Sequence, residues 1–167
     1  MRVADVMSSR PVTISPEAQV DEALRLASTY GVAHLVVTRG RLPVGVVCVR
    51  CDLGNAKPRH SVGQYMRRPV TIGAYETAER VSRRMCQRGV GAVIVRGGDA
   101  SWGIATRGDL LRAGFKAGDE AGLFFCAACG THTHVHPVPG SKWVAFCVDC
   151  WDRAGPPQIG DDLGVSD

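Results

Sequence analysis

Four cysteines near the C-terminus of this 167-residue chain have the spacing of metal ligands. They form two Cys-x-x-Cys pairs with 17 residues (130–146) between the pairs: Cys126, Cys129, Cys147 and Cys150. This spacing is typical of structural zinc sites, in which four thiolates complete a tetrahedral shell and leave no position for water. The same all-thiolate shell suits iron. The sequence therefore predicts a structural metal site, with Zn²⁺ favoured over iron.

The segment around these cysteines has too few large apolar residues to fold on a hydrophobic core alone, so metal binding must supply folding energy. On its four cysteines it resembles a zinc ribbon of the rubredoxin-like kind, which implies a structural or partner-binding role. Three histidines alternate between the two pairs: His132, His134 and His136. Alternate residues share one face of a strand, which allows a second metal site or a polar outer face. We favour the polar face.

A second candidate site lies at Thr106, Arg107 and Asp109, where a predicted strand ends and a helix begins. The Thr106 hydroxyl can cap the first helical amides or hold a phosphate, because a helix N-terminus favours an anion. Asp109 lies one turn later on the same face, where a carboxylate can accept hydrogen bonds from both hydroxyls of a ribose. Arg107 adds charge for a phosphate. The alternative is that Thr106 and Asp109 only begin and solubilise the helix.

The elements that must position these residues form an internal repeat. Pro11-Val12-Thr13-Ile14 recurs as Pro69-Val70-Thr71-Ile72, an offset of 58. Each copy has a first strand there, then a helical spacing of apolar residues (20–27 and 78–85) that ends at Gly31 or Gly89. Two apolar strands follow in each copy: 33–38 with 44–49, and 91–96 with 101–105. We expect a unit of strand, helix, strand, strand and helix, the last helix being 109–113 in the second copy, and we expect the two units to pack sheet to sheet.

The repeat and its motifs resemble a tandem CBS domain pair, the Bateman module, over residues 1–115. The chain opens with Val-x-Asp-Val-Met at Val3–Met7, and the stretch from Gly103 to Asp109 matches the ligand motif Gly-h-h-Thr-x-x-Asp, where h is apolar. The resemblance implies an α/β (α+β) fold with two repeats packed as a pseudo-twofold pair. It also implies a homodimer formed through the pair and a non-catalytic role in binding an adenine nucleotide such as AMP, ADP or ATP.

The resemblance further implies how the ligand lies. Thr106 and Arg107 would contact phosphate, and Asp109 would contact the ribose. The adenine ring would lie in an apolar cleft formed by two stretches of the second copy: Val70, Thr71 and Ile72, and Val90, Gly91 and Ala92. These nine residues are the predicted ligand-binding set.

The first copy departs from the ligand motif. Cys48 stands at the position of Thr106 and Cys51 at that of Asp109, while Asp52 comes one residue late, a rotation of about 100° on a helix. Either a one-residue bulge returns Asp52 to the cleft or this half-site is degenerate, and we expect the latter, with one nucleotide per pair. Cys48 and Cys51 also form a Cys-x-x-Cys pair, which suits thiol redox chemistry. We favour the alternative that they are small buried hydrophobes.

Charge divides the chain near the end of the repeat. Residues 1–116 hold 18 basic and nine acidic residues, and residues 117–167 hold two and seven, so the net charge of +4 combines +9 with −5. We expect repeat 1 over 1–58, repeat 2 over 59–116, a linker over 117–124, the zinc ribbon over 125–154 and a disordered tail over 155–167.

Composition narrows the function class. No apolar run approaches the roughly 20 residues that span a bilayer, and the first residues lack a secretory signal, so we expect a cytoplasmic protein with reduced cysteines. A regulatory sensor is the first hypothesis. The alternative is a zinc-ribbon, nucleic-acid-binding or transcription-associated regulator with basic clusters at Arg67-Arg68 and Arg83-Arg84. An enzyme is not expected, because the sequence shows no Ser/His/Asp order, paired carboxylates or open metal shell.

Overall fold

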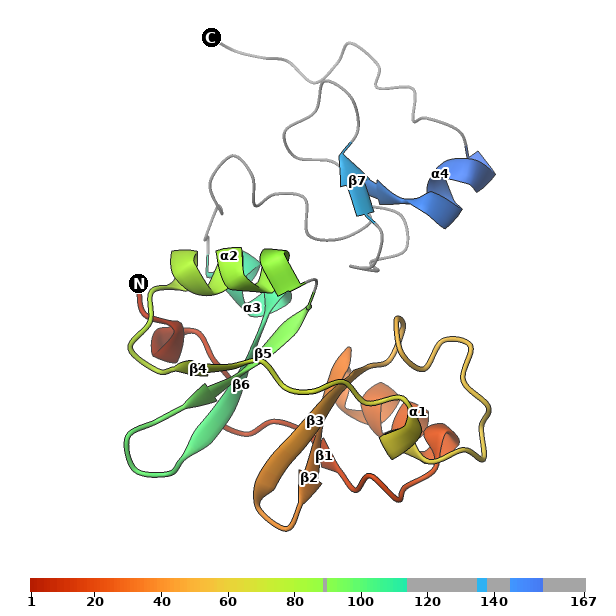
Figure 1. Cartoon of the computed structure of the whole chain (residues 1–167), viewed down its shortest axis with the longest axis horizontal. Helices are drawn as coiled ribbons and strands as arrows, with labels where there is room; N and C mark the ends of the chain where they lie inside the picture. Colours follow the sequence, from red (N-terminus) through yellow and green to blue (C-terminus); the bar gives the residue numbers. More distant parts are fainter. Residues whose placement is uncertain (89, 114–134, 138–144, 155–167) are drawn as a thin grey trace, which may run out of the picture.

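The computed structural model describes residues 1–88, 90–113, 135–137 and 145–154. The first repeat contains a 3-10 helix (Val3–Asp5), β1 (Thr13–Ile14), α1 (Val20–Tyr30), β2 (His34–Arg39) and β3 (Leu42–Cys48). The second contains a 3-10 helix (Val62–Gln64), β4 (Thr71–Gly73), α2 (Ala78–Arg88), β5 (Ala92–Arg96), β6 (Trp102–Thr106) and α3 (Arg107–Arg112). The C-terminal part contains β7 (Val135–Pro137), β8 (Ala145–Cys147) and α4 (Val148–Ala154) (Figure 1). Among these described segments, no helix has the length and apolar character needed to cross a membrane.

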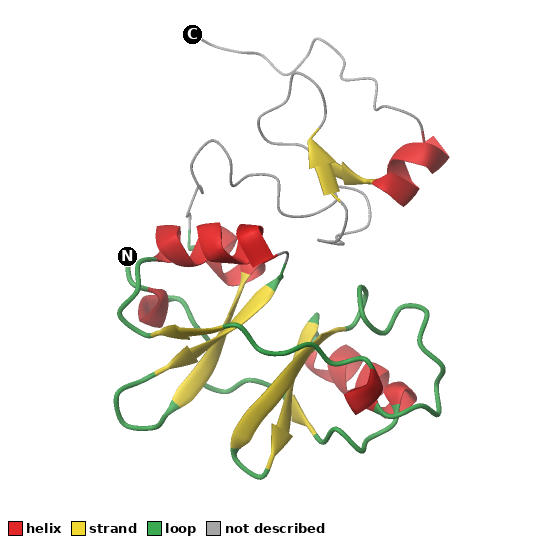
Figure 2. Cartoon of the chain, in the orientation of Figure 1, coloured by secondary structure: helices red, strands yellow, loops and turns green. Residues whose placement is uncertain are grey.

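Two three-stranded sheets of the same topology form the repeats. One has the order β1-β2-β3 and the other β4-β5-β6, each with a parallel first pair and an antiparallel second pair (Figure 2). The registers are equivalent, since Val36 pairs with Val46 and Ile94 pairs with Ile104, 58 residues later in each case. The predicted repeat and its mixed α/β fold are confirmed.

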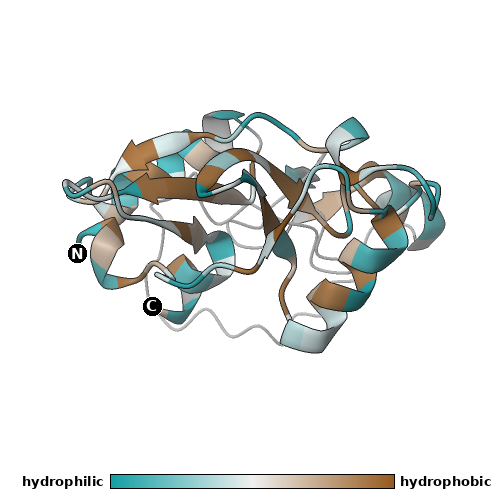
Figure 3. Cartoon of the chain, turned by 90° about the horizontal axis from the view of Figure 1, so that it is seen from below, coloured by the Kyte–Doolittle hydropathy of each residue, from teal (hydrophilic) through white to brown (hydrophobic). Residues whose placement is uncertain are grey.

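The central strands are buried on both faces because successive side chains point to opposite sides. On β2, Leu35 and Val37 pack in the core beside α1, whereas Val36 packs toward the other sheet. The shared core between the two sheets consists of Val36, Val46, Ala92, Ile94 and Ile104. The expected sheet-to-sheet packing is therefore present, and Figure 3 shows these strands as the most hydrophobic part of the molecule.

The helix ends follow their sequence signals. Gly31 ends α1 in the left-handed conformation with φ of 63°, which a glycine adopts without steric cost. The Thr77 hydroxyl accepts the Arg80 N–H at 3.3 Å, the bond of an N-cap residue. Gly89, the predicted end of α2, lies outside the described residues.

The segment that precedes the first strand of each copy packs against the other copy. Val3 belongs to the core beside α2, and Val62 belongs to the core beside α1. We call residues 3–8 and 62–67 the crossing segments. Equivalent backbone bridges hold them in place: Ser8 with Ile104, and Arg67 with Val46. Each copy therefore gives its N-terminal segment to the hydrophobic core of the other copy.

The final helix expected in each unit occurs only in the second. α3 follows β6 at once, whereas residues 49–55 after β3 form turns, so the prediction of a helix there is wrong. The N–H groups of Asp52 and Leu53 both donate to the Cys48 carbonyl, at 2.9 and 3.3 Å, which widens the turn. Gly54 follows directly, and glycine disfavours continuation of a helix.

Candidate functional site

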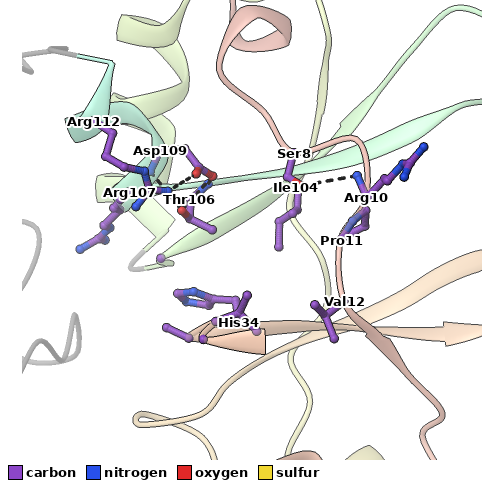
Figure 4. Close-up of a pocket in the computed structure, with 15 residues that line it drawn as sticks. Ser8, Arg10, Pro11, Val12, His34, Ile104, Thr106, Arg107, Asp109 and Arg112 are labelled. Carbon is purple, nitrogen blue, oxygen red and sulfur yellow. Dashed lines mark hydrogen bonds and ion pairs between the residues drawn. The ribbon is translucent and has the colours of Figure 1, made fainter. Parts of the chain in front are cut away.

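A cleft of about 390 Å³ lies between the two copies. The first copy contributes Ser8 and residues 10–12, which precede β1, and residues 31–34, which lead from the end of α1 into the start of β2. The second contributes Gly91, Ile104, residues 106–109 and Arg112, where β6 meets α3. Figure 4 shows the two sets facing each other across the cleft.

Thr106 and Asp109 hold each other in place at the start of α3. The backbone N–H and the hydroxyl of Thr106 both donate to Asp109 Oδ2, at 2.8 and 2.9 Å. The Asp109 N–H donates back to Thr106 Oγ1 at 3.2 Å. This is a reciprocal helix cap, and it fixes a hydroxyl and a carboxylate side by side on the cleft wall. Helix capping and cleft lining are thus carried out by the same two side chains.

The second carboxylate oxygen of Asp109 is available to a ligand at small cost. Asp109 Oδ1 pairs with Arg112 Nη2 at 2.5 Å, but the Arg112 side chain is 74% exposed. An ion pair with so exposed a partner contributes roughly 0–1 kcal/mol. A ligand hydroxyl can therefore replace Arg112 on this oxygen.

The cleft carries more positive than negative charge. Arg10, Arg107 and Arg112 line it, against the single carboxylate of Asp109. Arg107 is buried, with 7% of its surface exposed, and its Nε donates to the Val90 carbonyl at 3.1 Å. The arrangement favours an anionic ligand that also presents hydroxyl groups.

The structure divides the nine residues predicted to bind the ligand. Four line the cleft: Gly91, Thr106, Arg107 and Asp109. Three line a second, smaller pocket: Val70, Val90 and Ala92, and Gly91 lines this pocket too. Thr71 is exposed on β4, and Ile72 is buried in the core beside α2.

This division has a physical reason. Because the crossing segments exchange between the copies, the Thr-Asp motif of the second copy faces residues 10–12 and 32–34 of the first. Sequence reasoning assigned residues 70–72 and 90–92 of the second copy, which are equivalent to residues 12–14 and 32–34 of the first. The expected pseudo-twofold packing carries the signal that could have found them, because it places each motif against residues near the other copy's first strand.

The equivalent pocket beside the first copy's motif has a volume of only about 20 Å³. Asp52 nevertheless takes the same place as Asp109, because its Oδ2 accepts the Cys48 N–H at 2.8 Å, as Asp109 accepts that of Thr106. The extra residue in the turn thus returns the carboxylate to this half-site. Arg67 Nε donates to Asp52 Oδ1 at 2.7 Å, and this hydrogen bond raises the pKa of Arg67. The half-site of the first copy thus keeps its carboxylate, but its pocket is too small for a nucleotide.

The first copy's cysteines are in close contact. The Cys51 N–H donates to Cys48 Sγ at 3.4 Å. The hydrogen bond with the Cys51 side chain, together with burial, raises the pKa of Cys48. Cys48 thus keeps its proton at neutral pH.

Two of the four predicted metal ligands lie among the described residues. Cys147 ends β8 and is buried, and the Cys150 N–H donates to its Sγ at 3.4 Å. Hydrogen bonds of this kind orient a metal-ligating atom. His136 is exposed on β7, and the other predicted residues lie outside the described part: Cys126, Cys129, His132 and His134. Within the described ranges, no group of three or more His, Cys, Asp or Glu side chains comes together as a metal site.

The arginines considered for nucleic-acid binding are mostly matched with carboxylates. Arg83 pairs with Glu79 at 2.5 Å, and Arg84 pairs with Glu76 at 3.5 Å. Arg67 pairs with Asp52, and Arg68 lines the smaller pocket. This pattern lowers the positive potential that nucleic-acid binding requires, and it does not favour that alternative.

Comparisons with known proteins agree with this geometry. A sequence model of the CBS domain matches residues 3–50 and 62–116, more than half of the chain. The CBS domain of a bacterial CNNM/CorC family Mg²⁺ transporter is similar at 21% identity and a TM-score of 0.62, over 69% of this chain and 75% of that one. CBSX2 in complex with AMP is similar at 25% identity and a TM-score of 0.58, over 69% of this chain and 96% of that one. A CBS domain pair in complex with 5′-methylthioadenosine and S-adenosyl-L-methionine is similar at 22% identity and a TM-score of 0.61, over 68% and 94% of the two chains. No curated protein matches the chain.

Proposed function

The chain belongs to the CBS domain family, of which it carries two copies in tandem, and we propose that this pair is a non-catalytic regulatory module that binds an adenine nucleotide. The observation that carries the proposal is the cleft of about 390 Å³ whose wall holds the Thr106–Asp109 cap. The adenosine ligands of CBSX2 and of the second CBS domain pair support the ligand class.

Each group of the nucleotide has a partner in the cleft. Asp109 Oδ1 accepts hydrogen bonds from the two ribose hydroxyls after it releases Arg112. The Thr106 hydroxyl and Arg107 contact phosphate, and Arg10 adds charge from the first copy. Hydrogen bonds to a charged carboxylate are worth about 1.5–3 kcal/mol each. The adenine ring then rests on the apolar residues from the first copy.

Binding of this kind has a regulatory consequence. The ligand contacts residues of both copies, so its affinity depends on how the two copies pack across the core between their sheets. A ligand that binds one packing better than another shifts the population toward it. The proposed output is therefore a change in the relative position of the two copies.

The test is equilibrium binding of AMP, ADP, ATP, S-adenosylmethionine and NAD to the full chain, by calorimetry and thermal shift. We expect at least one adenine ligand to bind, and Asp109→Ala to weaken it by about 10- to 150-fold, which corresponds to 1.5–3 kcal/mol. Asp52→Ala is the matched control, since it removes the equivalent carboxylate from the closed half-site and should leave the affinity unchanged. Absence of binding, or equal losses in both variants, would refute the proposal.

We also propose that Cys126, Cys129, Cys147 and Cys150 bind Zn²⁺ in a structural site of a zinc ribbon. The turn geometry of the described pair supports it, because one backbone N–H already points at the Cys147 sulfur. Zinc would supply folding energy to this part of the chain and no chemistry. Elemental analysis of protein purified without added metal should give one zinc per chain, and Cys147→Ser should abolish it. Iron in place of zinc would correct the metal, and no metal would refute the site.

Two further properties are proposed: a homodimer formed through the repeats, which the resemblance implies, and a cytoplasmic location, which the composition favours. Sedimentation equilibrium with and without nucleotide tests the first. Fractionation of cells that express the full chain tests the second.

A further inference from the structure

Cys48 stands where the second copy has the Thr106 hydroxyl, and Cys51 directly precedes Asp52, which supplies the carboxylate of this half-site. Cys48 ends β3, and Cys51 lies three residues later in the turn that follows. Residues three apart in a tight turn can lie within the roughly 7 Å between Cα atoms that a disulfide spans. The bond from the Cys51 N–H to Cys48 Sγ, 3.4 Å long, folds the backbone of one cysteine onto the sulfur of the other.

The turn that carries the pair is held in this form by other bonds. The Asp52 carboxylate accepts the Cys48 N–H at 2.8 Å, and the Asp52 N–H donates to the Cys48 carbonyl at 2.9 Å. Arg67 holds the other oxygen of the same carboxylate. The fold itself therefore keeps the two cysteines close, so that a disulfide between them needs little further ordering of the backbone.

We propose that Cys48 and Cys51 are a reversible modification site that forms an intramolecular disulfide on reaction with small disulfides of the oxidised glutathione class. The site is separate from the nucleotide cleft and does not depend on nucleotide binding.

The two cysteines have different parts in the reaction. Cys51 is the more accessible, whereas Cys48 is 6% exposed. The Cys51 thiolate attacks the reagent, whose S–S bond breaks and releases one glutathione thiolate, which takes up a proton. Cys48 then gives up its proton to solvent and attacks Cys51 Sγ, so that the bond between Cys51 and glutathione breaks and the second glutathione leaves as a thiolate, which takes up a proton. Two protein thiols are oxidised and one reagent disulfide is reduced to two thiols.

The order of attack follows from the surroundings of Cys48. Burial and the hydrogen bond with Cys51 raise the pKa of Cys48, so it reacts second and only with its neighbour. With a bulky alkylating reagent at neutral pH, we expect Cys51 to react at least ~10-fold faster than Cys48.

Trypsin provides a direct readout, because it cleaves after Arg50 and places the two cysteines in separate peptides, 42–50 and 51–59. The folded full chain is incubated with graded ratios of oxidised to reduced glutathione, blocked with acid and alkylating reagent, and digested. We expect the two peptides to appear disulfide-linked, to account for most of peptide 42–50 at oxidising ratios, and to separate again on reduction. Cys86 lies in its own tryptic peptide and serves as the control for unspecific oxidation.

Two variants keep the result interpretable. Cys48→Ser should leave a stable glutathione adduct on Cys51, and Cys51→Ser should leave Cys48 unmodified in the folded chain. The proposal is overturned if Cys51 of the unaltered chain stops at the glutathione adduct, if neither cysteine reacts, or if Cys86 becomes linked as readily as Cys48. Nucleotide affinity measured on the same samples reports separately on the cleft.

Discussion

The two half-sites between the repeats share one backbone-to-carboxylate hydrogen bond, but they differ in the backbone that follows it and in the space beside it. In both, a carboxylate accepts the N–H of the last strand residue at 2.8 Å. One half-site opens into a cleft of about 390 Å³, and the other retains about 20 Å³. A repeated fold has therefore produced one site with room for a nucleotide and one without.

The difference arises on the crossing segments. Ser8 bridges to Ile104 beside the open cleft, and Arg67 bridges to Val46 beside the closed one, so the two residues are equivalent under the repeat. Ser8 leaves the cleft open, whereas the long Arg67 side chain extends to Asp52. The two carboxylates thus have different arginine partners: Asp52 pairs with Arg67 of the crossing segment, whereas Asp109 pairs with the exposed Arg112 of α3.

The largest effect should come from exchange of the small residue for the large one. Ser8→Arg places a guanidinium near Asp109, as Arg67 lies near Asp52, and should weaken nucleotide binding by about 100-fold or more, a loss of about 2.7 kcal/mol. Calorimetry measures the affinity. The control is Ser9→Arg, which adds the same charge at the adjacent exposed residue outside the cleft lining. Equal losses in both variants would show that charge alone, and not the position of Ser8, is responsible.

The reverse exchange should open the closed half-site. Arg67→Ser removes the partner of Asp52, whose side chain is 6% exposed, so we expect the free energy of unfolding to fall by about 1–3 kcal/mol. The same variant should bind a second nucleotide, which raises the stoichiometry from one to two per chain. Urea unfolding with added nucleotide and calorimetric titration measure the two effects. A stoichiometry that stays at one would mean that the half-site excludes a ligand without Arg67, for example because Cys48 stands in place of the Thr106 hydroxyl.

The strands of both repeats and the end of α1 could be predicted from the sequence, because local patterns determine them. The offset of 58 residues and the apolar runs gave the strands, and Gly31 gave the end of α1. The exchange of crossing segments was not predictable, since Val3 and Val62 are equally apolar and either could pack against its own copy. The return of Asp52 depends on a widened turn, which the spacing left as one of two alternatives. The closure by Arg67 depends on a side-chain direction that no periodicity encodes.

A smaller effect should separate phosphate contacts from ribose contacts in the open cleft. Arg10 is exposed and lines the cleft from the first copy. Arg10→Ala should weaken ATP binding by about 3- to 10-fold, or about 1 kcal/mol, because the lost charge faces solvent, and it should leave adenosine binding unchanged. Competition binding with both ligands measures the ratio. If adenosine weakens as much as ATP, Arg10 supports the shape of the cleft and does not contact phosphate.

A last effect concerns stability and not affinity, and it follows from the difference between Cys48, which titrates, and Thr106, which does not. The pKa of Cys48 is raised in the folded chain by its hydrogen bond with Cys51 and by burial, whereas an unfolded cysteine has a pKa of about 8.5. Between these two values the folded state holds a proton that the unfolded state has lost, so this contribution is fully present below about pH 8.5 and declines as the pH rises above it. Cys48→Thr gives the first copy the hydroxyl of the second and removes that titration. Between pH 8 and pH 10, the free energy of unfolding should therefore decline less in the variant than in the unaltered chain, by about 1–2 kcal/mol. Urea unfolding at both pH values measures it. Parallel declines in the two proteins would mean that Cys48 ionises as readily in the folded chain as in the unfolded one.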